Sequence, residues 1–364
     1  MKFSDVLDIR NGRNQRQVEN KNGKYPIYGS GGVMGRADDY ICDAETVVIG
    51  RKGSINNPIF VNEPFWNVDT AFGLVAHREV LLPKYLYYFC VKFNFEQLNT
   101  TVTIPSLTKA NLLQIEINVP DMETQLHVVG VLDKICHLIE LRQKQLHELD
   151  QVIKSRFIEL FGDVKTNKFG WEKCRFGDVS VKITDGEHGT VPRVNKDDGY
   201  LYLMARNITK DGTVDLSETS YVPEDVHRKI YKRCNPEKDD ILLVCVGATI
   251  GKCTIVPADL GEFSMARSVA LIKPDKRKVD STFLVSLLKS DAIQSDISEC
   301  AHAAAQAGLY TNMIVNLDAF LPPLELQNQF SAFVEQTDKS KMAIQQSLDK
   351  LEMLKKSLMQ QYFG

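Results

Sequence analysis

The sequence predicts an α+β fold: two globular mixed α/β domains separated by two long antiparallel helices that form a coiled coil, with a pseudo-twofold internal repeat. Three observations predict it: a repeated segment, a heptad-like spacing inside that segment, and short strand-like runs elsewhere. The length of 364 residues also exceeds what one ordinary core accommodates, so two or more domains are expected.

The repeat aligns residues 112–162 with residues 314–364 without a gap, at a constant offset of 202. Ten of the 51 positions are identical, including the pair Gln125 and Gln327 and a closing Phe-Gly dipeptide. The preceding segments correspond loosely, because FSDVLDIRNG (3–12) resembles FGDVSVKITDG (176–186). Each half is therefore predicted to be a variable globular domain followed by one long helix.

Apolar residues in each repeated segment recur with a period of about 3.5, which predicts a coiled-coil helix. About 37 residues at ~1.5 Å each give a helix of roughly 55 Å, too long for one small domain. Polar interruptions complement each other, since Arg142 and Arg156 stand where the second helix has Ile344 and Leu358. An ordinary amphipathic packing helix is the alternative. The predicted seam comprises Leu132, Ile139, Leu146, Leu149, Ile153, Val334, Ile344, Leu348, Leu351 and Leu358.

The remaining parts of both halves predict short strands and a few helices. Strands are expected in ETVVIG, NPIFV, FGLVAH, DILLVCV, KCTIV and SVALIKP, which turn residues separate. LPKYLYYFCVKFNFEQL and STFLVSLLKSDAIQSDI are predicted to be helical. The expected division is a first domain at 1–110, a helix at 111–163, a second domain at 164–315 and a second helix at 316–364.

Composition predicts a soluble, cytoplasmic protein with no membrane span, no signal peptide and reduced cysteines. The eight cysteines lie far apart and suggest no zinc site. A net charge of −3 argues weakly against nucleic-acid binding. The segment 9–36, however, contains six basic residues and a single acid, Glu19. A solvated loop explains that cluster equally well.

Two glycine-rich stretches suggest nucleotide-binding loops, but neither matches the motif that such a loop requires. YGSGGVMG has Met34 where a G-x-G-x-x-G fingerprint needs glycine, so a tight turn between strands or a close approach to a partner is predicted. ILLVCVGATIGKC has a phosphate-loop spacing one residue short and ends in Cys253 instead of Ser or Thr. The tetrapeptide NPIF departs from the N-P-P-aromatic motif of amino-methyltransferases at Ile59. No catalytic group, metal site or cofactor is predicted.

From end to end the chain resembles the specificity subunit of Type I restriction–modification enzymes. In the first half the resemblance rests on NGR, GKYPIYGSGGVMGRADDYICDAETVVIGRKGSINNPIFV, FWNVDTAFGLV and TIPSLTKANLLQIEINVP. In the second half it rests on ITDGEHGTVPR, GYLYLMARNI, MARSVALIKP and FLPPLELQNQF. DGEHGTVPR and AHAAAQAGLYTNM depart from the commoner family pattern, which leaves the base preference open.

The resemblance implies two target-recognition domains, each reading one half of a split double-stranded DNA sequence through the major groove. It also implies two modification (methyltransferase) subunits and two restriction (endonuclease/translocase) subunits as partners, no membrane, and no chemistry in this chain. Arginine, asparagine and backbone near glycine can contact base edges and phosphates. The expected DNA-binding residues are Arg13, Gly31, Gly32, Arg36, Arg51, Lys52, Ser54, His188, Arg193, Arg206, Asn207 and Arg267.

Two other classes of function stay open at this point. One is an enzyme, either a DNA methyltransferase or a fused restriction–modification polypeptide, and the missing cofactor loop speaks against it. The other is a helical scaffold for protein partners that does not bind DNA.

Overall fold

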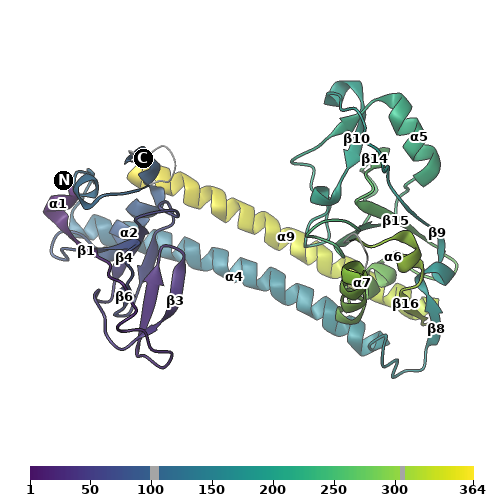
Figure 1. Cartoon of the computed structure of the whole chain (residues 1–364), viewed down its shortest axis with the longest axis horizontal. Coiled ribbons are helices and arrows are strands. Elements are labelled where there is room, and N and C mark those ends of the chain that lie inside the picture. The colour runs from purple at the N-terminus through teal and green to yellow at the C-terminus, as the bar shows by residue number, and fades with distance from the viewer. Residues whose placement is uncertain (99–105, 304–307) are drawn as a thin grey trace. The chain divides into compact units, whose positions relative to one another are not determined.

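A computed structural model describes residues 1–98, 106–303 and 308–364 (Figure 1). The start of the TIPSLTKAN motif and part of AHAAAQAGLYTNM lie outside the described residues. The chain forms two compact units: unit 1 is Met1–Lys144 with Ile344–Gly364, and unit 2 is Gln145–Ala343. The division therefore falls inside both long helices. Among the described residues, no helix combines the length and apolar character that a membrane crossing requires.

The two repeated segments form the long helices α4 (Met122–Phe161) and α9 (Leu324–Phe363), each of 40 residues. Gly162 follows α4 with a φ of 77°, a conformation that suits glycine at a helix C-terminus. All ten seam residues named from the sequence are buried or half-buried in the structure. The long helices that the periodicity predicts are therefore present, slightly longer than expected.

The main sheet of unit 1 has the strand order β1-β7-β4-β5, and neighbouring strands are antiparallel. A smaller sheet has the order β3-β2-β6. The strands are β1 (Leu7–Asn11), β2 (Tyr25–Gly29), β3 (Gly32–Ala37), β4 (Thr46–Gly50), β5 (Ile59–Val61), β6 (Trp66–Asn67) and β7 (Ala71–Ala76). The shorter helices are α1 (Phe3–Val6), α2 (Pro83–Lys92), η1 (Phe95–Leu98) and α3 (Lys109–Leu112).

The start of α4 and the end of α9 complete the core of unit 1. Val128 and Leu132 of α4 share a buried apolar cluster with Met359 of α9. Phe363 packs edge-on to Tyr85 of α2 at a ring distance of 5.0 Å. Helix α2 thus anchors the C-terminal end of α9, and both chain ends lie in this unit (Figure 1).

The main sheet of unit 2 has the order β13-β12-β15-β9 and is also antiparallel. Smaller sheets have the orders β11-β10-β14 and β16-β8. The strands are β8 (Glu172–Arg175), β9 (Ser180–Asp185), β10 (Tyr200–Leu203), β11 (Tyr221–Val222), β12 (Ile241–Val244), β13 (Cys253–Ile255), β14 (Phe263–Met265), β15 (Val269–Pro274) and β16 (Asp318–Leu321). The shorter helices are η2 (Phe176–Val179), η3 (Lys196–Asp198), η4 (Ala205–Asn207), α5 (Glu224–Cys234), α6 (Ser281–Leu288), α7 (Asp291–Ala303) and α8 (Thr311–Val315).

The end of α4 and the start of α9 pack together in unit 2. Phe161 of α4 lies 5.5 Å from Phe330 of α9 and 4.8 Å from Phe283 of α6, measured between ring centroids. Lys341 of α9 donates to Asp150 of α4 at 2.7 Å. Because α4 meets the end of α9 in unit 1 and its start in unit 2, the two helices run antiparallel.

The internal repeat extends to tertiary structure. Strands β1, β7, β4 and β5 correspond in order to β9, β15, β12 and β13, and α2 corresponds to α6. Gln125 and Gln327 are both 0% exposed and make equivalent hydrogen bonds to main-chain groups. Every strand-like run named from the sequence contains a strand, and STFLVSLLKSDAIQSDI forms two helices, α6 and α7, instead of one. The predicted α+β fold class is confirmed.

Candidate nucleic-acid interface

A loop held by an equivalent main-chain hydrogen bond follows the first strand of the main sheet in each unit, β1 in unit 1 and β9 in unit 2. Gly12 donates its amide to Ala71, and Gly186 donates its amide to Val269 in the equivalent place. A Cβ atom on Gly12 would lie 1.7 Å from a main-chain oxygen of the β6–β7 turn, and one on Gly186 would lie 2.1 Å from the oxygen of Met265. Only glycine permits this approach, and it fixes the residues that follow, among them Arg13.

The glycines of YGSGGVMG form the turn of a β2–β3 hairpin, as the sequence predicts. Gly29 pairs with Gly32, whose φ of 114° lies in the region that favours glycine. A Cβ atom added to Gly50 would lie 2.9 Å from the Cβ of Ser30, so the turn rests against the end of β4. The loop after β4 carries Arg51, so the turn and this basic loop lie side by side.

The β4–β5 loop presents its cationic side chains to solvent on a fixed backbone. The amide of Arg51 donates to Thr70, and its carbonyl accepts from Leu107 at 2.9 Å. The Arg51 guanidinium lies 5.8 Å from the centre of the Phe72 ring. Lys52 and Ser54 follow and are exposed. The structure thus brings together Gly31, Gly32, Arg51, Lys52 and Ser54.

Arg36 does not lie beside the glycine turn, which corrects the expectation from the sequence. It pairs with Pro26, at the opposite end of the hairpin from the Gly29–Gly32 pair. Its guanidinium donates to the carbonyl oxygens of Gly23 and Lys24, both at 2.6 Å. Arg36 therefore holds a loop of its own unit.

In unit 2 four of the expected residues gather near the ends of β9, β10 and β14. Arg193 lies 4.3 Å from the centre of the Tyr202 ring, and both Arg193 and Arg206 reach the sulfur of Met204. Arg267 donates its amide to the carbonyl of Glu187, while its side chain is exposed. His188, the next residue after Glu187, lies 2.6 Å from Asp185.

Asn207 is buried and hydrogen-bonded within unit 2, which argues against the predicted contact with DNA. The residue is 2% exposed. Its side-chain amide donates to the carbonyls of Asp215 and Glu218, and its side-chain oxygen accepts from the amide of Met204, all at 3.0 Å. Asn207 shapes the loop that carries Arg206, and both hydrogens of its side-chain amide are already donated to carbonyls of that loop.

The sequence reasoning missed helix α5, whose exposed face is basic. Its buried side is made by His227, Ile230 and Cys234. Spacings of three and four residues of this kind predict an amphipathic helix, and the segment VHRKIYKRC contains that signal together with four cations and no acid. Arg233 donates to the carbonyl of Gly186 at 2.6 Å, so α5 borders the loop of the candidate interface.

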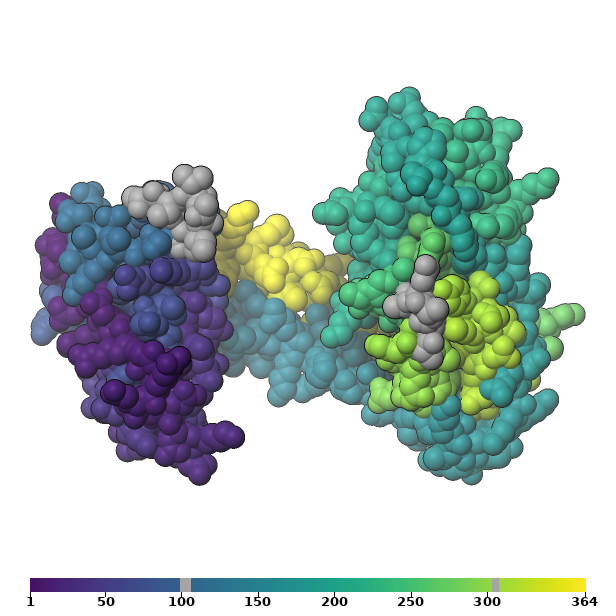
Figure 2. All heavy atoms as spheres, viewed as in Figure 1, coloured from purple at the N-terminus to yellow at the C-terminus, as the bar shows by residue number. Residues whose placement is uncertain are grey.

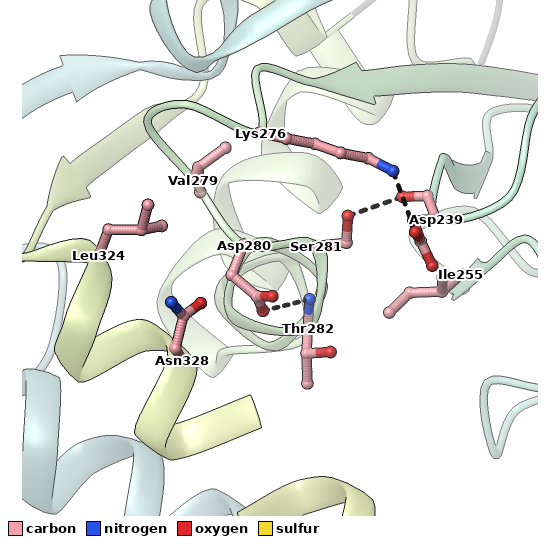
Figure 3. Close-up of a pocket in the computed structure, with 9 residues that line it drawn as sticks. All are labelled: Asp239, Ile255, Lys276, Val279, Asp280, Ser281, Thr282, Leu324 and Asn328. Carbon is pink, nitrogen blue, oxygen red and sulfur yellow. Dashed lines mark hydrogen bonds and ion pairs between the residues drawn. The ribbon is translucent and has the colours of Figure 1, made fainter. Parts of the chain in front are cut away.

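No arrangement typical of catalysis is present in the described part of the chain. No group of three or more His, Cys, Asp or Glu residues there could hold a metal ion. A shallow pocket of about 300 Å³ in unit 2 is lined by groups that bond to one another (Figure 3). Lys276 pairs with Asp239, and Asp280 accepts from the amide of Thr282 to cap α6. The charged groups that line this pocket are therefore engaged in contacts within the protein.

Taken together, the two units present fixed loops with exposed cations on a repeated framework, an arrangement typical of DNA-recognition proteins. Residues 1–151 match the family model described as the Type I restriction modification DNA specificity domain. The resemblance identified from the sequence is thereby confirmed: this chain is related to the specificity subunits of Type I restriction–modification systems, and its function is DNA target recognition.

Relatives of the same class extend this similarity beyond the matched domain. The EcoBI specificity subunit of Escherichia coli is 22% identical over 350 residues, which cover 88% of this chain and 73% of that protein. A putative type I specificity subunit of Haemophilus influenzae is 23% identical, covering 93% of this chain and 88% of the relative. The similarity therefore includes both halves of the repeat.

Solved structures support the same fold. The specificity subunit from M. genitalium aligns over 100% of this chain and 95% of its own, with a TM-score of 0.66 and 16% identity. A chain from a structure on complex assembly and conformational transition of the type I system aligns over 100% of this chain and 96% of its own, with a TM-score of 0.57 and 14% identity.

Proposed function

We propose that each unit reads one half of a bipartite, asymmetric DNA target. The observation that carries the proposal is a shared framework with different side chains at equivalent positions. Arg13 follows Gly12 in unit 1, and Glu187 follows Gly186 in unit 2. Arg51 donates its amide to the residue before β7, as Cys245 does to the residue before β15. Equal backbones with unequal side chains fit two half-sites of different sequence.

Arginine reads guanine and binds phosphates, whereas glutamate accepts from cytosine amino groups. The charge difference between Arg13 and Glu187 alone therefore favours different base pairs in the two half-sites. Arg51 and Lys52 in unit 1, and Arg193, Arg206 and Arg267 in unit 2, supply the cations that phosphates and base edges require.

In this proposal the chain acts without chemistry of its own, inside a complex with two modification and two restriction subunits. The helices α4 and α9 set the gap between the half-sites and dock the modification subunits. Because chromosomal DNA is the proposed ligand, the site of action is the cytoplasm.

Methylome sequencing of a host that expresses the chain with its modification subunits tests the proposal. We expect a split motif with an adenine methylated on each strand, and changed bases in only one half when Arg13 is replaced. The chain incubated alone with DNA and a methyl donor should transfer no methyl group. A continuous motif, or a substitution that alters both halves equally, would count against two independent reading units.

A further inference from the structure

A charged surface that the sequence did not reveal is the exposed face of α5 in unit 2. Four cations, Arg228, Lys229, Lys232 and Arg233, are exposed there. His227 fixes the opposite side of the helix, because its ring stacks on Tyr200 at 3.9 Å between ring centroids. The helix, β10 and β14 belong to one lobe of unit 2, seen in Figures 1 and 2.

Two contacts place this face next to the loop that follows β9. Arg233 donates to Gly186, and Lys229 lies 3.9 Å from the carboxylate of Glu187, a separation at the outer limit of an ion pair. Arg267 donates its amide to the same Glu187. The α5 cations therefore continue the surface on which Arg267 lies.

The cations of α5 are only partly neutralised by the protein. Arg228 pairs with Glu224, and the one ion pair of Lys229 among the described residues is the long contact with Glu187. Lys232 forms no ion pair within the residues that the structure describes. Cations near a helix C-terminus also stabilise the helix dipole, but that role does not account for a surface that adjoins the candidate interface.

Unit 1 has no helix between β2 and β6 in this position. We propose that the exposed face of α5 holds the sugar–phosphate backbone beside the second half-site, so that unit 2 grips DNA through more phosphates than unit 1 does. This inference rests on the proposed function and assigns the backbone contacts of one unit. Phosphate binding by lysine and arginine carries no sequence information, so the surface adds affinity and leaves the recognised bases unchanged.

The test replaces Lys229 and Lys232 together by glutamine in the chain assembled with its modification subunits. The probes are a duplex with the target defined by methylome sequencing and a random-sequence duplex of equal length. Each lost phosphate contact lowers the slope of log affinity against log salt by about 0.9, so two contacts lower it by about 1.8 and the affinity about 30-fold at roughly 0.15 M salt. The loss should be similar on both probes, and the methylated motif should stay the same.

The matched control is Lys229→Arg with Lys232→Arg, which keeps both charges and should keep slope and affinity. If the glutamine variant binds both probes with unchanged slope, the proposal for α5 is wrong while DNA recognition stands. If the wild-type complex does not prefer its target over the random duplex, the proposed function itself fails. A changed methylated motif would mean that α5 reads bases, which also overturns the proposal.

Discussion

The buried glutamines of the repeat allow a prediction whose control is built into the chain. Gln125 accepts from the amide of Leu82 at 2.8 Å and donates to the carbonyls of Val80 and Pro120 at 2.8 and 2.9 Å. Gln327 accepts from the amide of Asp280 at 2.9 Å and donates to two carbonyls, one of them from the equivalent proline. Each side chain therefore ties the start of a long helix to the loop before α2 or α6.

Replacing Gln125 or Gln327 by alanine leaves three main-chain groups without a partner. A buried polar group left unpaired costs about 1–3 kcal/mol, and water can reach part of this site, so we expect each substitution to cost about 2–4 kcal/mol. The costs should be similar and additive, because the two sites lie in different units and share no partner. Gln143→Ala is the control, since Gln143 is an exposed glutamine of the same repeat.

The two tryptophans report on the units separately in urea unfolding. Trp66 is buried in unit 1, and Trp171 is half-buried in unit 2. In a Trp171→Phe background, Gln125→Ala should move the fluorescence transition to lower urea. In a Trp66→Phe background, Gln327→Ala should do the same. A shift below about 0.5 kcal/mol for either substitution, the size of an ordinary surface change, would refute the reasoning.

Three further predictions follow from the described contacts. Arg51→Gln should weaken target binding about fivefold at roughly 0.15 M salt if one phosphate contact is lost. Arg36→Gln should leave target binding unchanged, and competition binding assays with half-site variants measure both affinities. Leu149 and Leu351 are both half-buried, so Leu149→Ala with Leu351→Ala should lower the free energy of unfolding by an amount near the lower end of ~2–5 kcal/mol per residue. The double variant should also assemble less well with the modification subunits. An unchanged melting temperature together with an unchanged gel-filtration profile of the complex would exclude packing at the seam. Burial raises the pKa of Cys253 from 9.0 to about 11 and of Cys245 to about 12. As the pH rises from about 9 towards 12, these thiols ionise in the unfolded chain before they ionise in the folded protein, so the free energy of unfolding should fall. Native thiols that react with a disulfide reagent as fast at about pH 8 as urea-unfolded ones would contradict this.

The two long helices and the six named strand runs could be predicted because their signals are local. The period of the long helices and the turn residues around the strands are visible in the sequence, and the structure contains the corresponding elements. The sheet orders could not be predicted, because β1 pairs with β7 through contacts between segments more than sixty residues apart. The small sheets, which contain the parallel pairs β2–β6 and β10–β14, also depend on such distant contacts.

The candidate site was harder to predict than the fold. Residue type determines which contacts a side chain can make, but tertiary contacts decide whether the side chain is available to bind a ligand. Arg36 and Asn207 have suitable types, yet Arg36 donates to the carbonyls of Gly23 and Lys24, and Asn207 is buried with both amide hydrogens donated to carbonyls. Arg51 and Arg267 meet the same criterion of residue type, and their side chains stay exposed. Nothing local in the sequence separates these two pairs.

Comparing the two units suggests why helix α5 occurs in only one of them. The equivalent loops carry Arg13 in unit 1 and Glu187 in unit 2, so unit 2 has an acid where unit 1 has a cation. An acid at a DNA surface repels phosphates unless nearby cations offset it. Lys229 and Arg233 of α5 lie at that loop, one near the Glu187 carboxylate and one on the Gly186 carbonyl. Under the proposed function, Glu187 would read a base while the α5 cations bind the backbone, so that one repeated framework would serve two unlike half-sites.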